Sequence, residues 1–130
     1  MIALLMYSDG SVHILSLGIQ KEEITVNQSH LSVSLPEYSM ASLIKCSNDM
    51  DAVVCVQEKS IVIYTTLLEL RGMISLENPS IVDCCLTRYG LFLVMNREKG
   101  GVICKFNYCG DYVNDLSLSS SMYSFFDCIQ

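Results

Sequence analysis

The sequence predicts an all-β protein built of antiparallel meanders, and two observations carry this prediction. Short apolar runs rich in β-branched and aromatic residues recur along the chain, and polar turn residues separate them. Residues 90–118, GLFLVMNREKGGVICKFNYCGDYVNDLSL, show the pattern most clearly, because apolar runs and polar reversals alternate within one stretch. We expect this stretch to form a β-meander.

The first part of the chain predicts a hairpin and a further strand of the same sheet. Residues 2–7 form an apolar run, an Asp-Gly dipeptide at 9–10 indicates a tight turn, and residues 11–17 form the second arm. A polar reversal is expected at residues 18–23. Alternating apolar residues from 24 to 35 then predict a third strand.

Two segments leave a choice between helix and strand. Residues 36–46 open with Pro36 and carry apolar residues at helical spacing, but a strand leading into the next hairpin is favoured. The leucines of residues 67–76 permit a helix, whereas Gly72 and the β-rich neighbouring segments favour an outer strand or an irregular crossing. If both segments are helical, the fold becomes α+β, with two short helices on an antiparallel sheet.

The second half of the chain predicts a series of hairpins. Polar turns are expected at Asn78-Pro79 and at residues 88–90. The expected strands comprise residues 52–57, 60–66, 81–86, 91–95, 102–106, 112–118 and 122–129.

Composition limits the classes of function. A chain of 130 residues allows one domain with one core. Charged residues make up 17% of the chain, against about 25% in ordinary soluble domains, so apolar surface is left for a partner to cover. The net charge of −6, with eight scattered Lys and Arg, argues against a nucleic-acid partner.

The hydrophobic content does not predict a membrane protein. The longest stretch without charged side chains, residues 24–36, is polar in its middle and too short to span a bilayer as a helix. The first ten residues lack the basic region and the cleavage site of a signal peptide. We therefore expect a cytoplasmic protein without a membrane span, with the nucleus as the alternative compartment.

The seven cysteines indicate reduced core residues. Their number is odd, no C-x-x-C pair occurs, and five of them lie inside apolar runs, so neither a disulfide framework nor a zinc site is expected. A cysteine nucleophile needs a base, and His13 and His30 are not near any cysteine in the sequence. We expect no catalytic, cofactor-binding or metal site and no small-molecule substrate.

An internal repeat accompanies the strand pattern. Strands that follow a reversal begin near residues 12, 61 and 102, so they are separated by 49 and 41 residues, close to the roughly 40–45 residues of a four-stranded propeller blade. The segments YSDGSVHILSL, EKSIVIYTT and LTRYGLFLVMNREKGGVICKFNYCGDYV resemble divergent WD40-type β-propeller blades. The Trp-Asp dipeptide and the Gly-His pair of that family are absent. The resemblance implies a role like that of scaffolding and trafficking proteins.

We expect residues 1–130 to form a single β domain of about three repeat-like units. Propellers typically have at least four blades, so three units do not close a comfortable ring. Three arrangements stay open: the chain is an excerpt of a larger propeller, two copies associate, or the strands form a compact sandwich or barrel. The first two leave sheet edges for a partner.

These observations predict a non-catalytic protein–protein interaction or scaffold module that binds a protein partner or itself. The first alternative is a small α+β trafficking adaptor subunit, and the second is a thiol-dependent enzyme. Recognition is expected in turns, because strands hold turns in fixed positions. The candidate interaction residues are Tyr7, Asp9, Glu58, Lys59, Arg88, Tyr89, Arg97 and Lys99.

Overall fold

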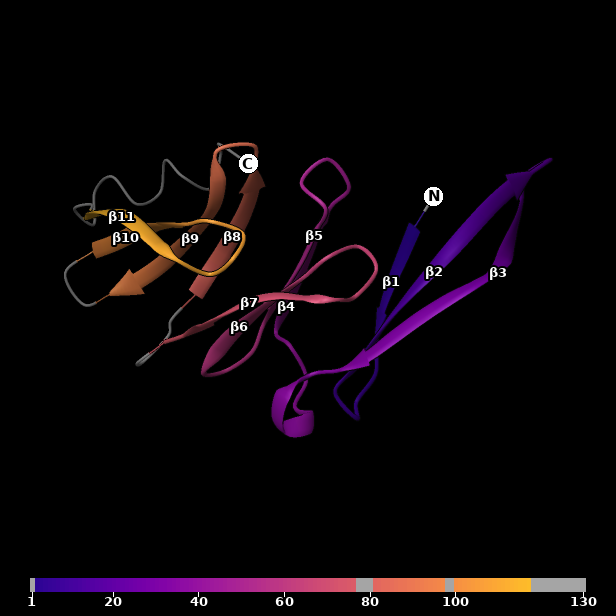
Figure 1. The fold of residues 1–130 in the computed structure, drawn as a ribbon, viewed down its shortest axis with the longest axis horizontal. Coiled ribbons are helices and arrows are strands. Elements are labelled where there is room, and N and C mark those ends of the chain that lie inside the picture. The colour runs from indigo at the N-terminus through magenta and orange to yellow at the C-terminus, as the bar shows by residue number, and fades with distance from the viewer. Residues whose placement is uncertain (1, 77–80, 98–99, 118–130) are drawn as a thin grey trace. The chain divides into compact units, whose positions relative to one another are not determined.

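The computed structural model describes residues 2–76, 81–97 and 100–117, and their regular structure is almost entirely β-strand (Figure 1). All strand pairs in it are antiparallel, so the all-β prediction is confirmed. The chain divides into two compact units, Met1–Ser42 and Leu43–Gln130, and each is described by itself. The expectation of a single domain stays a prediction.

The first unit is a three-stranded meander followed by one turn of 3-10 helix. Its elements are β1 (Ile2–Met6), β2 (Ser11–Gln20), β3 (Glu23–Ser34) and η1 (Pro36–Tyr38). The Asp-Gly turn between β1 and β2 forms as expected, and Gly10 has a φ of +83°. A Cβ on Gly10 would lie 2.5 Å from the carbonyl carbon of Tyr38, so this close approach also requires glycine.

The expected reversal at residues 18–23 is wrong. Strand β2 continues through Gln20 and pairs with β3 as far as Gln20–Glu23, so only Lys21 and Glu22 form the turn. Both turn residues have positive φ, which is the backbone of a two-residue hairpin turn. The polar residues of this stretch lie in paired strands, because polar side chains are compatible with a solvent-exposed face of a two-stranded ribbon.

The second unit contains two four-stranded sheets. Each is an up-and-down meander, because hydrogen-bonded neighbours are consecutive in the chain. The first sheet comprises β4 (Leu43–Ser47), β5 (Ala52–Val56), β6 (Ser60–Tyr64) and β7 (Leu70–Ser75). The second comprises β8 (Ile81–Thr87), β9 (Gly90–Arg97), β10 (Gly100–Phe106) and β11 (Tyr112–Ser117).

Both helical alternatives are wrong, and with them the α+β fold. Residues 36–46 contain only the 3-10 turn before β4, because Glu37 and Tyr38 have positive φ and stop any helix. Residues 67–76 contain β7, where Ile74 pairs with Ile61 and is buried. Tertiary packing of Ile74 outweighs the helical propensity of the leucines. The expected strand 122–129 and the turn at 78–79 lie outside the described residues.

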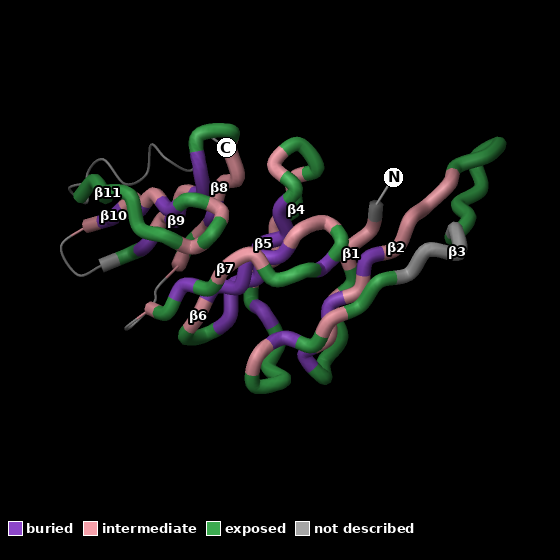
Figure 2. Tube along the Cα trace, in the orientation of Figure 1, coloured by how far each residue is buried: buried purple, intermediate pink, exposed green. Residues whose placement is uncertain are grey.

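Facing sides of the two sheets form one hydrophobic core in the second unit. Every residue of β5 is buried, as Figure 2 shows along the tube, so this central strand is shielded on both faces. Strand β4 contacts β8, the first strand of the other sheet. The core residues are Val54, Val56, Ile61, Ile63, Ile74, Cys84, Leu91, Leu93, Met95, Val102, Cys104 and Phe106.

Three turns share one hydrogen-bond pattern. In each five-residue turn, the backbone N–H of the first residue donates to the carbonyl oxygen of the fifth residue. The N–H of the fourth residue donates to the carbonyl oxygen of the first residue. The fourth residue is left-handed, with φ of +83° at Gly10, +59° at Leu68 and +88° at Gly110. This is a three-residue hairpin loop with a bulge. The turns comprise residues 7–11, 65–69 and 107–111.

The turn at residues 107–111 lies directly against β7. A Cβ added to Gly72 would overlap the backbone carbonyl of Cys109, and one added to Gly110 would lie 3.0 Å from the carbonyl oxygen of Met73. The two backbones therefore approach each other more closely than any side chain permits. This contact holds the second sheet against the first.

We expect Gly72→Ala to destabilise the protein by about 1–3 kcal/mol, because the methyl group forces the turn away from β7. Chemical denaturation monitored by circular dichroism measures the change. Ser75→Ala is the control on the same strand, since Ser75 is exposed and its change should stay within about 0.5 kcal/mol. Equal stability of the two variants would contradict the contact.

Candidate functional site

Four turns gather at one end of the sheets in the second unit. Strands β5, β7, β9 and β11 all begin at this end, because every second connection between the strands of each meander lies there. Arg71 and Tyr108 connect the turns, and we call these two residues the Arg71–Tyr108 pair. The turns comprise residues 48–51, 65–69, 88–89 and 107–111.

Arg71 reaches from β7 to the neighbouring turn of its own sheet and to the other sheet. Its guanidinium donates to the carbonyl oxygens of Met50 at 2.8 Å and Asp51 at 2.9 Å. Its Cζ also lies 5.3 Å from the ring centroid of Tyr108, within the range of a cation–π interaction. The cation is thus satisfied by protein groups on two turns, one from each sheet.

Tyr108 extends the same connection to the turn between β8 and β9. Its hydroxyl donates to the carbonyl oxygen of Thr87 at 2.6 Å, and burial raises the pKa of this phenol. A neutral donor and a packed ring stabilise the end of the sheets, so the Arg71–Tyr108 pair is structural. Sequence analysis missed both residues, and the only signal was the position of Tyr108 in the turn before Gly110.

Carboxylates at this end accept hydrogen bonds from residues of the turns. Asp51 accepts hydrogen bonds from the Thr66 hydroxyl at 2.5 Å and the Thr66 backbone N–H at 2.8 Å, and these bonds lower its pKa. Asp111 accepts from the side-chain amide of Asn107 at 3.0 Å. Within the part of the chain that the structure describes, no group of three His, Cys, Asp or Glu could hold a metal ion.

The candidate interaction residues do not form one site. Arg88 and Tyr89 lie exposed beside the Arg71–Tyr108 pair, and the Arg88 guanidinium donates to the Tyr89 hydroxyl at 2.6 Å. Glu58 and Lys59 are exposed at the opposite end of the same sheets, between β5 and β6. Tyr7 and Asp9 belong to the first unit. The side chain of Arg97 and all of Lys99 lie outside what the structure describes.

A serine, a histidine and an aspartate meet on the first unit, but not as a nucleophilic triad. The Ser11 hydroxyl donates to Asp9 Oδ1 at 2.6 Å, and His13 Nε2 lies 2.9 Å from the same hydroxyl. Because the single hydroxyl proton is directed to Asp9, His13 is the donor in the second bond. A nucleophilic serine instead gives its proton to histidine. Hydrogen bonds from Ser11 lower the pKa of Asp9.

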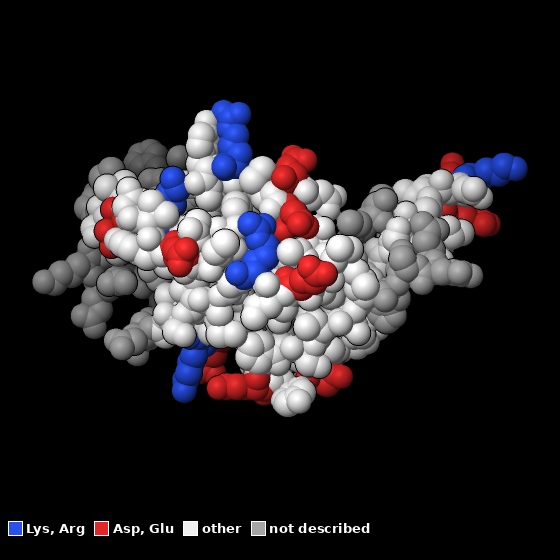
Figure 3. Space-filling model, in the orientation of Figure 1, with Lys and Arg blue, Asp and Glu red and all other residues white. Residues whose placement is uncertain are grey.

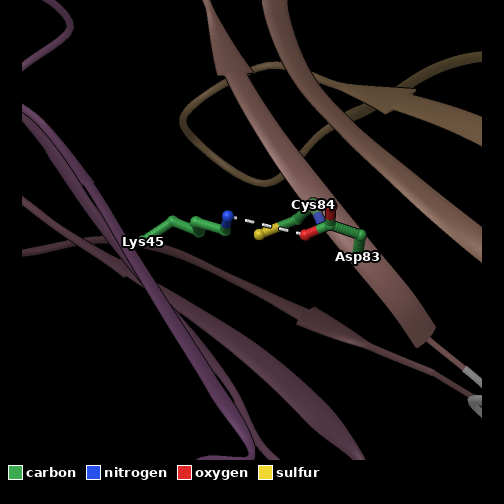
Figure 4. Close-up of polar contacts among 3 residues, drawn as sticks. All are labelled: Lys45, Asp83 and Cys84. Carbon is green, nitrogen blue, oxygen red and sulfur yellow. Dashed lines mark hydrogen bonds and ion pairs between the residues drawn. The ribbon is translucent and has the colours of Figure 1, made fainter. Parts of the chain in front are cut away.

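Cys84 lies beside a charged pair (Figure 4). Lys45 Nζ lies 3.7 Å from Asp83 Oδ1, the same oxygen accepts the backbone N–H of Cys84, and the Cys84 side chain lies beside this pair (Figure 4). The ammonium favours a thiolate, but burial outweighs it and raises the pKa of Cys84 to about 12. Burial likewise raises the pKa of Cys55 to about 12. Such thiols stay protonated and unreactive near neutral pH.

No protein-family model, no curated protein and no solved structure matches this chain. Its own geometry is therefore the guide to function. No helix in the described ranges is long and apolar enough to cross a membrane. In Figure 3, acidic and basic side chains are interspersed among uncharged atoms, without a large patch of one sign on the visible face.

Among the described residues of the second unit, five of the eight exposed large apolar side chains lie on the last strands of the two sheets. Strand β7 is the last strand of its sheet and exposes Leu70 and Met73. Strand β11 is the last strand of the other sheet, and all six of its residues are exposed, including Val113 and Leu116. We call β7 and β11 the outer strands. Because the turn at residues 107–111 lies against β7, β11 is the outer strand best suited to contact another molecule.

Tyr108→Phe should lower the free energy of unfolding by about 1 kcal/mol, because the Thr87 carbonyl loses its donor. Tyr89→Phe removes a hydroxyl from an exposed ring at the same end and should change stability by less than about 0.5 kcal/mol. Urea titration of both variants provides the comparison. A larger loss in Tyr89→Phe would show that the Arg71–Tyr108 pair does not hold this end together.

Alkylation of the native protein should separate the thiols by burial. Exposed Cys46 and Cys109 should react first, and buried Cys55, Cys84 and Cys104 should react only on unfolding. Mass spectrometry of peptides after timed alkylation at pH 7 gives each rate, with the denatured chain as control. Rapid native modification of Cys84 would contradict its raised pKa and restore the case for thiol chemistry.

Proposed function

We propose that this chain is a non-catalytic protein–protein interaction module of β-propeller type, which uses the outer strand β11 as a binding edge. The observation that carries the proposal is the composition of β11, an edge strand whose pairing with β10 is interrupted only by a bulge at Val113. Edge strands in natural proteins ordinarily carry lysine, proline or inward charges that prevent pairing with another chain. The sequence of β11, YVNDLS, has no basic residue and no proline, and it exposes apolar side chains on both faces.

The architecture of the second unit supports the propeller-type part of the proposal. Each sheet is a four-stranded antiparallel meander, as in a propeller blade. The two sheets share a core, and their first strands, β4 and β8, contact each other. Blades of a propeller pack in this face-to-face manner around their first strands. The free thiols of the described residues suit a reducing, intracellular compartment.

Backbone pairing explains how an outer strand would bind. An extended segment of a partner adds to a sheet edge through main-chain hydrogen bonds, and side-chain contacts provide selectivity. On β11, Leu116 lies on the same face as Ile103, its cross-strand neighbour on β10. A partner strand beside β11 therefore gains backbone bonds and an adjoining apolar surface.

The edge-blocked variant Val113→Lys/Leu116→Lys tests the outer strand β11. We expect it to lower both the mean mass in light scattering and the fluorescence of the apolar dye ANS relative to the unmodified chain, because buried or paired lysine is unfavourable at an edge. The matched control, Asn48→Lys/Asp49→Asn, makes the same change in charge at an exposed turn. Far-UV circular dichroism confirms that each variant is folded.

Either of two results would contradict the proposal. In the first, the unmodified chain is folded, monomeric at all concentrations and does not bind ANS. In the second, the edge-blocked variant and its control change mass and dye binding equally, which would assign the effect to charge and not to β11.

A further inference from the structure

Strands β2 and β3 extend well beyond the end of β1, the third strand of their sheet. Strand β1 pairs with β2 only between Met6–Val12 and Ile2–Ser16, whereas β2 and β3 continue to pair as far as Gln20–Glu23. Residues 17–26 therefore form a two-stranded ribbon, visible as the long hairpin in Figure 1. We call this ribbon the arm. An isolated two-stranded ribbon is only marginally stable in water.

The register makes the arm amphipathic. Leu17 lies opposite Val26 and Ile19 opposite Ile24, and residues directly opposite share one face. We call these four side chains the aliphatic face. The other face carries Gly18 with Thr25 and Gln20 with Glu23, and the Thr25 hydroxyl donates to the Gly18 carbonyl at 3.3 Å.

The aliphatic face is open to solvent. Ile24 is 71% exposed, Val26 61% and Ile19 56%. Buried Val12 and Ile14 precede an irregularity in the pairing of β2 with β3 between Leu15 and Leu17, whereas Leu17 and Ile19 follow it. Given these exposed fractions, the packing that buries Val12 and Ile14 does not cover the aliphatic face.

We propose that the aliphatic face packs against the same face of a second copy of this chain, with the twofold axis running along the arm. The inference rests on the proposed interaction role and names a second copy as the partner of the first unit. A closed twofold contact uses the same patch on both subunits, so the patch must complement itself. In this arrangement β2 of one arm lies over β3 of the other, and Ile19 meets Ile24 of the second copy.

Charge at the tip of the arm favours this partner and this axis. The turn carries Lys21 and Glu22, followed by Glu23 at the start of β3. The twofold places Lys21 of one arm opposite the acidic side of the other tip, and the same contact occurs twice. Glu23 lies on the other face of the arm, so the opposite charges that meet beside the aliphatic centre are Lys21 and Glu22.

Charge reversal tests the pairing of tips. The experiment uses the edge-blocked variant Val113→Lys/Leu116→Lys, so that association through β11 does not contribute. In this background we expect a dimer, and we expect Lys21→Glu alone and Glu22→Lys alone to weaken it about tenfold or more, since every change acts twice. An equimolar mixture of the two should recover the dimer as a heterodimer. Sedimentation equilibrium measures each dissociation constant.

Two controls separate the tip contact from general charge and from damage to the fold. Glu58→Lys makes the same change in net charge outside the arm as Glu22→Lys, and it should not recover a dimer with Lys21→Glu. Ile24→Thr keeps a β-branched residue but removes apolar surface, so it should weaken the dimer. Gln20→Thr, on the polar face, should not.

The outcomes distinguish this inference from the proposed function. A monomeric edge-blocked variant, or a mixture that fails to recover the dimer, overturns arm pairing and leaves the role of β11 intact. A third outcome is that the heterodimer is recovered but the edge-blocking substitutions alter neither mass nor ANS binding. That outcome supports arm pairing and contradicts the proposed binding role of the outer strand β11. Equal effects of Ile24→Thr and Gln20→Thr would show that the aliphatic face is not the contact.

Discussion

The close approach of two backbones at Gly72 is the constraint on which the second unit depends. The turn at residues 107–111 reaches β7 only because neither Gly72 nor Gly110 has a side chain there. This approach brings Tyr108 beneath Arg71 and within hydrogen-bond distance of Thr87. Turns of both sheets are thereby joined at one end, while the shared core joins their faces.

The cysteine thiols of this core contribute to packing and are not reactive. Cys55, Cys84 and Cys104 are buried and act as small hydrophobic residues, since removal from water disfavours their thiolates. The lysine beside Cys84 does not reverse this effect, because desolvation is the larger influence on the thiol. Asp9 and Asp51 likewise accept hydrogen bonds from the hydroxyls of Ser11 and Thr66. Polar chemistry here stabilises turns.

Apolar surface remains where regular pairing stops. The arm extends past the end of β1, and β11 ends its sheet without the lysine or proline that usually protects an edge. The arm exposes aliphatic side chains, and β11 exposes apolar side chains beside a free backbone edge. We propose that association with protein surfaces accounts for both features.

The sequence by itself determined the strand class and most hairpins, because apolar runs and Gly-containing turns are local signals: Gly10, in the expected Asp-Gly turn, lies at a left-handed position. It did not determine the equivalent turn at residues 65–69, since Leu68 adopts a left-handed φ that leucine rarely takes. Nor could it place Arg71 on Tyr108, or show that Arg88 and Glu58 lie at opposite ends. Those relations join residues far apart in the chain, and only tertiary packing and strand register decide them.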